Sequence, residues 1–144
     1  MPKSKESAFD IIIPIVGDED NYHAYIEAKS LAKKAGFGDI SQALIGTVVS
    51  ELSTNIIRYA NRGEISIKII NENGKVGIEL KASDNGPGIE DVEKAMEDNY
   101  STTKHSLGLG LSSLKRIMDE YEISSKKDEG TIIIARIWQK NNEN

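Results

Sequence analysis

The chain has 144 residues, with 23 acidic and 18 basic side chains, a formal net charge of −5 and no cysteine. This length suits one folded domain, and an acidic chain without a dense basic block argues against nucleic acid as a partner. The missing cysteines exclude disulfides and cysteine nucleophiles, and the apolar runs are too short to span a bilayer. We therefore expect a cytoplasmic protein with one domain at residues 8–140, between flexible tails at 1–7 and 141–144.

The amino-terminal part of the chain predicts one strand followed by two helices. Residues 9–16 are rich in β-branched side chains, which is typical of a strand. Apolar positions then repeat at helical spacing over 18–36 and again over 39–61. Asp39 is a good N-cap for the second helix, and Gln42 three residues later completes a weak capping box.

The second helix carries two polar residues, Glu51 and Asn55, at the margin of its apolar face. On a helical wheel they flank a stripe that consists of Ile45, Val49, Leu52, Ile56 and Tyr59. Without partners, a carboxylate and an amide at this buried edge would cost on the order of 1 to 3 kcal/mol each. Two interpretations remain open: the pair braces a neighbouring loop, or a cation and its water supply the partners.

A hairpin is predicted next, and its second strand leads into a turn rich in glycine. Apolar and polar residues alternate over 64–70 and again over 76–82. The stretch Asp84-Asn85-Gly86-Pro87-Gly88 then fixes a sharp turn, because proline sets its own φ and glycine adopts angles closed to other residues. This turn is either an ordinary connection or a loop that can lie flat against a planar, polar ligand, with Asp84 as an acceptor.

A second stretch rich in glycine precedes another helix. Residues 99–106 show no periodicity, and we interpret them as a lid. The run Gly108-Leu109-Gly110-Leu111 leads straight into a helical pattern at 112–118, so bare backbone and N-terminal N–H groups could bind an anion. Close packing of this loop against a sheet is the alternative. Two strands at 124–127 and 131–138, joined by a tight turn, complete the pattern.

Four motifs in this order resemble the ATP-binding boxes of the GHKL superfamily. They are Glu51-x-x-x-Asn55, Asp84-x-Gly86-x-Gly88, Gly108-Leu-Gly110-Leu and Gly130-Thr131. The chain is most similar to one branch, the RsbT-type serine/threonine switch kinases of bacterial partner-switching (stressosome) pathways, although the related anti-sigma factor kinases share every box. The Bergerat fold of this superfamily implies a two-layer α/β sandwich, with a mixed, mostly antiparallel sheet and helices on one face.

The resemblance also implies a role for each matching residue. Asp84 would accept a hydrogen bond from the adenine amino group of ATP, Gly88 would leave room for the base, and Thr131 would complete the adenine site. Asn55 would bind Mg²⁺, and Glu51 would act as general base. The remaining nucleotide contacts are expected from Gly86, Lys104, Gly108, Leu109, Gly110 and Leu111.

The implied activity is an ATP-dependent protein serine/threonine kinase that phosphorylates a STAS-domain antagonist in stress signalling. A PP2C-type phosphatase or a sigma factor would be further partners, and a homodimer is left open. The alternative is an anti-sigma factor that sequesters a sigma subunit and uses kinase activity toward an anti-anti-sigma factor for release. A third interpretation is a nucleotide-dependent binding module without transfer, against which the presence of Glu51 argues.

Overall fold

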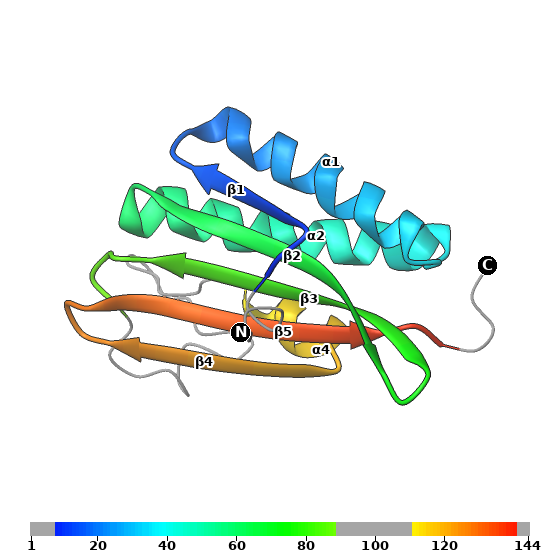
Figure 1. Ribbon diagram of the computed structural model, residues 1–144. Coiled ribbons are helices and arrows are strands. Elements are labelled where there is room, and N and C mark those ends of the chain that lie inside the picture. The colour runs from blue at the N-terminus through cyan, green and yellow to red at the C-terminus, as the bar shows by residue number, and fades with distance from the viewer. Residues whose placement is uncertain (1–7, 89–110, 141–144) are drawn as a thin grey trace.

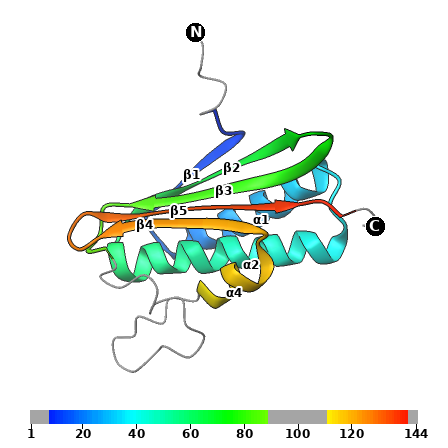
Figure 2. The same ribbon diagram turned by 90° about the horizontal axis from the view of Figure 1, so that it is seen from below.

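The computed structural model describes residues 8–88 and 111–140, which form a sheet with helices against one face (Figure 1). The elements in chain order are β1 (Ile11–Ile15), α1 (Asp18–Lys34), α2 (Asp39–Asn55), the π-helix η2 (Ile56–Ala60), β2 (Gly63–Glu72), β3 (Lys75–Asp84), α4 (Leu111–Ile117), β4 (Glu120–Lys126) and β5 (Gly130–Trp138). Figure 2 shows α1, α2 and α4 on the same side of the sheet. The predicted two-layer sandwich is therefore confirmed.

The sheet has five strands in the order β1-β2-β3-β5-β4, and each neighbouring pair in it is antiparallel. The predicted hairpin is formed by β2 and β3, and β5 inserts between β3 and β4. This order places the ends of β3 and β5 side by side, with Asp84 opposite Thr131. Two motifs that are far apart in the sequence therefore meet at one end of the sheet.

The core lies between the sheet and the helices. Alternate residues of the strands face the helices and are fully buried, as with Ile13, Ile65 and Leu80. The fully buried residues of α1 are alanines, at 24, 28 and 32, which lets its backbone approach closely, and Leu31 packs against the core beside them. Helix α2 supplies the larger apolar side chains of the predicted stripe.

The ends of α2 differ from the prediction. Its N-cap is Gly38 and not Asp39, and the side-chain amide of Gln42 donates to the Phe37 carbonyl, so the predicted capping box does not form. At the other end the helical path continues as predicted up to Asn61, but as the π-helix η2, and it stops where Asn61 takes a φ of 73°. A π-helix widens the turn and shifts the direction of the side chains that follow α2.

Strand β4 begins at Glu120, earlier than the predicted start at residue 124. The reason is pairing with β5, because the Asp119 N–H already donates to the Arg136 carbonyl and Glu120 stands opposite Arg136 in the ladder. The Asp119 carboxylate also accepts the backbone N–H of Trp138. Partners on β5, and not the local sequence, therefore decide where β4 begins.

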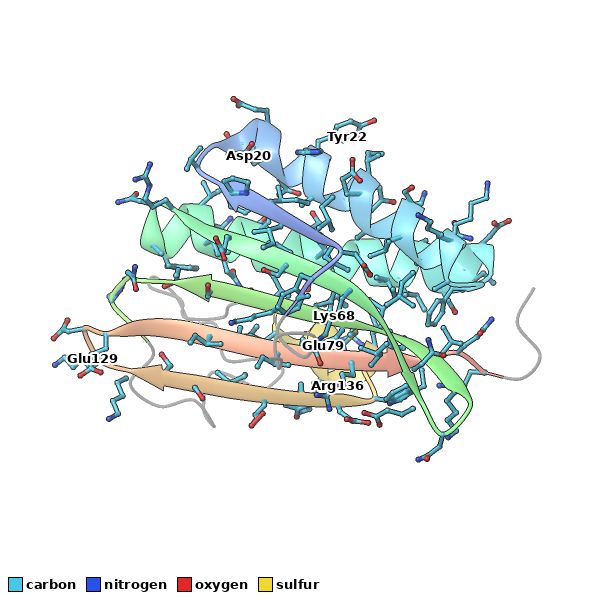
Figure 3. The ribbon with its side chains drawn as sticks, viewed as in Figure 1. Asp20, Tyr22, Lys68, Glu79, Glu129 and Arg136 are labelled. Carbon is cyan, nitrogen blue, oxygen red and sulfur yellow. The ribbon has the colours of Figure 1, made fainter. Side chains whose placement is uncertain are left out.

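The face of the sheet away from the helices carries a row of ion pairs. Lys68, Glu79 and Arg136 are opposite one another on β2, β3 and β5 (Figure 3). Arg136 Nε donates to Glu79 Oε1 at 2.7 Å, and Lys68 Nζ lies 3.9 Å from Glu79 Oε2. This row lets a nearly buried glutamate occupy the middle of a strand. In the ranges that the structure describes, no helix has the length and apolar character needed to cross a membrane.

Candidate active site

A cavity of about 120 Å³ lies between the end of α2, the π-helix and the sheet. Its walls are mostly apolar, with Leu52 and Ile56 on the helical side, Ala82 and Ile133 on the sheet, and Leu111 at the start of α4. An apolar protein cavity of roughly 150 Å³ is known to accommodate benzene. A space of this size and lining therefore suits a flat ring.

Asp84 is the only charged residue among the described residues that line this cavity. It ends β3, and its Oδ1 accepts the backbone N–H of Gly86 at 2.8 Å, which fixes the orientation of the carboxylate. Burial raises the pKa of Asp84, while hydrogen bonds from the backbone of Gly86 and Thr131 lower it. The carboxylate is thus a fixed acceptor in a mostly apolar space, as recognition of an amino group on a ring requires.

The turn after β3 needs glycine for a reason that involves no ligand. Gly88 has a φ of +78°, and a Cβ at this position would lie 2.0 Å from the carbonyl oxygen of Lys126. A Cβ on Gly86 would lie 2.6 Å from the Cβ of Ala60. The turn therefore packs tightly against the end of β4 and against η2. These contacts account for both glycines, and the room for a base that the resemblance assigns to Gly88 stays a prediction.

Glu51 lies one turn before Asn55 on α2 and outside the lining of the cavity. Its Oε2 accepts a hydrogen bond from Ser113 Oγ on α4 at 3.0 Å. Its Oε1 is buried and has no hydrogen-bond partner in the part of the chain that the structure describes. Burial raises the pKa of Glu51, whereas the Ser113 hydrogen bond and the charge of Arg116 lower it. The partner that braces Glu51 is therefore a neighbouring helix.

Asn55 is the last residue of α2 and lines the cavity together with Asp84 and Thr131. Its position confirms that the polar pair of α2 lies at the margin of the buried face, since Glu51 and Asn55 are both half-buried. Among residues 8–88 and 111–140, no three His, Cys, Asp or Glu side chains gather as a metal site would need. A cation beside Asn55 would therefore have no cluster of three such side chains from the described residues to bind it.

The structure brings Asn55, Asp84, Gly88, Leu111 and Thr131 around one cavity. Gly86 lies in the adjoining turn and Glu51 one helical turn away. Four predicted site residues lie outside the described residues, as does the predicted lid at 99–106: Lys104, Gly108, Leu109 and Gly110. Their expected contacts with phosphate stay predictions.

Sequence reasoning did not assign three residues, on η2 and α4, to the site. Tyr59, which the helical wheel placed in the apolar stripe, and Ala60 line the cavity from η2, and no pattern in the sequence distinguishes a π-helix from an α-helix here. Ser113 contacts Glu51 across two helices, and a serine in the first turn of a short helix carries no signal of such a contact. The place of all three in the site depends on how distant segments pack.

Comparison with known proteins agrees with this geometry. Residues 40–141 match the family described as histidine kinase-, DNA gyrase B-, and HSP90-like ATPase. The serine/threonine-protein kinase RsbT of Bacillus subtilis is 46% identical over 110 residues, which cover 76% of this chain and 82% of RsbT. An anti-sigma F factor of Thermoanaerobacter sp. is 39% identical over 94 residues, which cover 62% of this chain and 64% of that protein.

Among solved structures, the catalytic domain of the histidine kinase ThkA in a nucleotide-free form has a similar fold. The TM-score is 0.51 at 19% identity, with 90% of this chain and 98% of that domain covered, so this likeness concerns the fold alone. The family match covers well over half of the chain, and the identity to RsbT extends over most of both proteins. The chain belongs to the family of histidine kinase-, DNA gyrase B- and HSP90-like ATPases, and within it is closely related to the serine/threonine kinase RsbT.

Proposed function

We propose that the protein is an ATP-dependent serine/threonine kinase that phosphorylates a STAS-domain antagonist in a cytoplasmic partner-switching pathway. The observation that carries this proposal is the position of Glu51 beside a cavity that suits a planar ring. Glu51 is half-buried, and one of its carboxylate oxygens has no hydrogen-bond partner among the described residues. The 46% identity to a serine/threonine kinase over most of the chain supports the choice of a protein hydroxyl as acceptor.

The cavity binds the adenine ring of ATP in this proposal. Asp84 accepts a hydrogen bond from the adenine amino group, and Thr131 stands opposite it at the end of β5. The apolar walls from α2, η2 and the sheet cover the faces of the ring. A polar group at one fixed point in an apolar cavity gives orientation as well as affinity. Asp84 therefore sets the specificity for adenine.

A magnesium ion bound to the phosphates fits the residues near Asn55. A carboxamide oxygen is a hard ligand of the kind that Mg²⁺ prefers, and Mg²⁺ usually keeps several waters and binds few protein groups. The single amide at the margin of the cavity, without a cluster of acidic residues in the described ranges, suits an ion held mostly by phosphate and water. When bound, the ion neutralises charge on the phosphates. Lys104, Gly108 and Gly110 are the proposed further phosphate contacts.

Glu51 acts as the general base toward the acceptor hydroxyl. The proton of the substrate serine or threonine moves to a Glu51 oxygen, and the hydroxyl oxygen forms a bond to the γ-phosphorus. The bond between the γ-phosphorus and the bridging oxygen breaks, and ADP leaves with that electron pair. The raised pKa that burial gives Glu51 brings its basicity closer to neutral pH. A positioned base contributes roughly 10² to 10⁴ in rate.

The test is intact-mass analysis of a candidate STAS-domain protein from the same organism, after incubation with the chain and Mg-ATP. One added phosphate is expected with the unmodified chain and none with Asn55→Ala. Glu51→Gln should bind ATP with unchanged affinity, because the residue lies outside the cavity lining, and should transfer phosphate at least roughly 10²-fold more slowly. Loss of ATP binding in Glu51→Gln would contradict the role of base.

The similarity to anti-sigma F factors favours one second candidate function. In it the chain binds and sequesters a sigma subunit, and phosphorylation of an anti-anti-sigma factor serves its release. A pull-down with the tagged chain discriminates the two. Recovery of a sigma factor would support this second function, and recovery of a STAS scaffold or a phosphatase would support the first.

A further inference from the structure

The two carboxylate oxygens of Glu51 have unequal surroundings. Oε2 accepts a hydrogen bond from the Ser113 hydroxyl at 3.0 Å, and Oε1 is buried without a hydrogen-bond partner in the described part of the chain. A buried carboxylate oxygen without a partner is costly, so native proteins rarely retain one without use. The asymmetry leaves Oε1 as the carboxylate oxygen that Ser113 does not occupy.

Ser113 is itself held firmly. It is 8% exposed and lies in α4 between Leu111 and Leu114, which are both buried in the core. Its backbone position is therefore set by core packing, and its hydroxyl reaches only what lies next to it. A glutamate side chain has several rotamers of similar energy, and one directional hydrogen bond from a fixed donor selects among them.

We propose that Ser113 is a positioning residue, whose hydroxyl holds Oε2 of Glu51 so that Oε1 is the oxygen left to accept the proton of the protein substrate. This inference rests on the proposed kinase function. In the transfer step Oε1 takes the proton of the substrate hydroxyl, whose oxygen bonds to the γ-phosphorus while the bond to ADP breaks. Ser113 keeps its own proton throughout and donates to Oε2 before and after the step.

The helix that carries Ser113 also forms a wall of the cavity, because Leu111 lines it. The short helix α4 thus contacts both the catalytic base and the nucleotide cavity, and its packing against α2 fixes their relative position. A misplacement of about 1 Å can cost on the order of 10²-fold in rate. Loss of the Ser113 hydroxyl should therefore slow phosphate transfer without changing the affinity for ATP.

The experiment measures single-turnover transfer of labelled phosphate from ATP to the STAS-domain protein, with ATP affinity measured by calorimetry. Ser113→Ala is expected to lower the transfer rate constant by on the order of 10-fold at saturating ATP, with unchanged ATP affinity. Ser113→Cys, which keeps the volume but is a weak donor, should behave like Ser113→Ala. Ser30→Ala, the same change at an exposed position of α1, is the matched control and should transfer normally.

A double-mutant cycle separates positioning from mere packing. In the Glu51→Gln background, Ser113→Ala should change the residual rate no further, because the hydroxyl acts only through Glu51. An equal loss in both backgrounds, a weakened ATP affinity that accounts for the slower transfer, or a wild-type rate in Ser113→Ala or Ser113→Cys would each overturn the proposal. If the unmodified chain transfers no phosphate although it binds ATP, the proposed function fails and this inference fails with it.

Discussion

Asp84→Asn should invert the nucleotide preference of the protein. Oδ1 of Asp84 already accepts the Gly86 N–H at 2.8 Å, so an incoming adenine amino group must use the other carboxylate oxygen. The amide oxygen of the introduced asparagine would keep the contact with Gly86, because an NH₂ there would oppose an N–H. The substitution therefore turns an NH₂ donor toward the adenine amino group, which is a donor as well.

The expected loss of ATP affinity follows from the loss of a hydrogen bond to a charged carboxylate. Hydrogen bonds to charged groups contribute about 1.5–3 kcal/mol, which corresponds to roughly 10- to 100-fold in Kd. The 6-oxo group of guanine accepts where the adenine amino group donates, so affinity for GTP should rise while affinity for ATP falls. Since burial raises the pKa of Asp84, removal of its charge should leave the folded state no less stable.

The assay is calorimetric titration with non-hydrolysable ATP and GTP analogues at fixed magnesium and salt concentrations. Asp10→Asn is a matched control, because the Asp10 carboxylate also accepts a backbone N–H, from Ile69 at 2.8 Å, but does not line the cavity. An unchanged ratio of ATP to GTP affinity in Asp84→Asn would refute the adenine contact. Equal loss of both nucleotides would indicate instead that Asp84 only holds the turn.

Two further predictions concern stability and pH. Gly88→Ala should lower the free energy of unfolding by about 2 kcal/mol or more, measured by urea titration, through its positive φ and its contact with Lys126. Gly74→Ala is the control, because Gly74 has a φ of +82° but a Cβ there would have no atom within 4 Å, so only the cost of the positive φ remains. It should lose less stability than Gly88→Ala, and equal losses would contradict the argument from the Lys126 contact. Because burial raises the pKa of Glu51, transfer should decline on acidification at a pH above the ordinary glutamate range, as the base becomes protonated. A pH–rate profile of the unmodified chain checks this, and a decline that persisted unchanged in the residual activity of Glu51→Gln would rule Glu51 out as its cause.

Much of the fold could be predicted from the sequence because local patterns carry it. Alternation with period two predicted β2 and β3, since one face of each strand contacts the helices. The helical wheel placed Glu51 and Asn55 at the edge of the α2 stripe, where both are half-buried. Such inferences succeed where a single element and one buried face determine the pattern.

The remaining features depend on partners that a local pattern does not contain. The start of β4 is set by its ladder with β5, and the cap of α2 by Gly38, whose carbonyl accepts the Gln42 N–H. The π-helix after Asn55 forms where the chain must turn from α2 into β2 while Ile56 stays in the core. The Ser113 contact needs α4 folded against α2, and neither helix predicts that alone.

The rotation of α2 about its own axis decides whether Glu51 and Asn55 face the site, and polar contacts fix this rotation from the α1 side. Asn21 donates to Thr54 Oγ1 at 2.7 Å and accepts from Ser50 Oγ at 2.8 Å. An apolar stripe tolerates small rotations because dispersion contacts are not directional, whereas hydrogen bonds are. Since Ser50 and Thr54 immediately precede Glu51 and Asn55, holding the first pair against α1 turns the second pair toward α4 and the cavity.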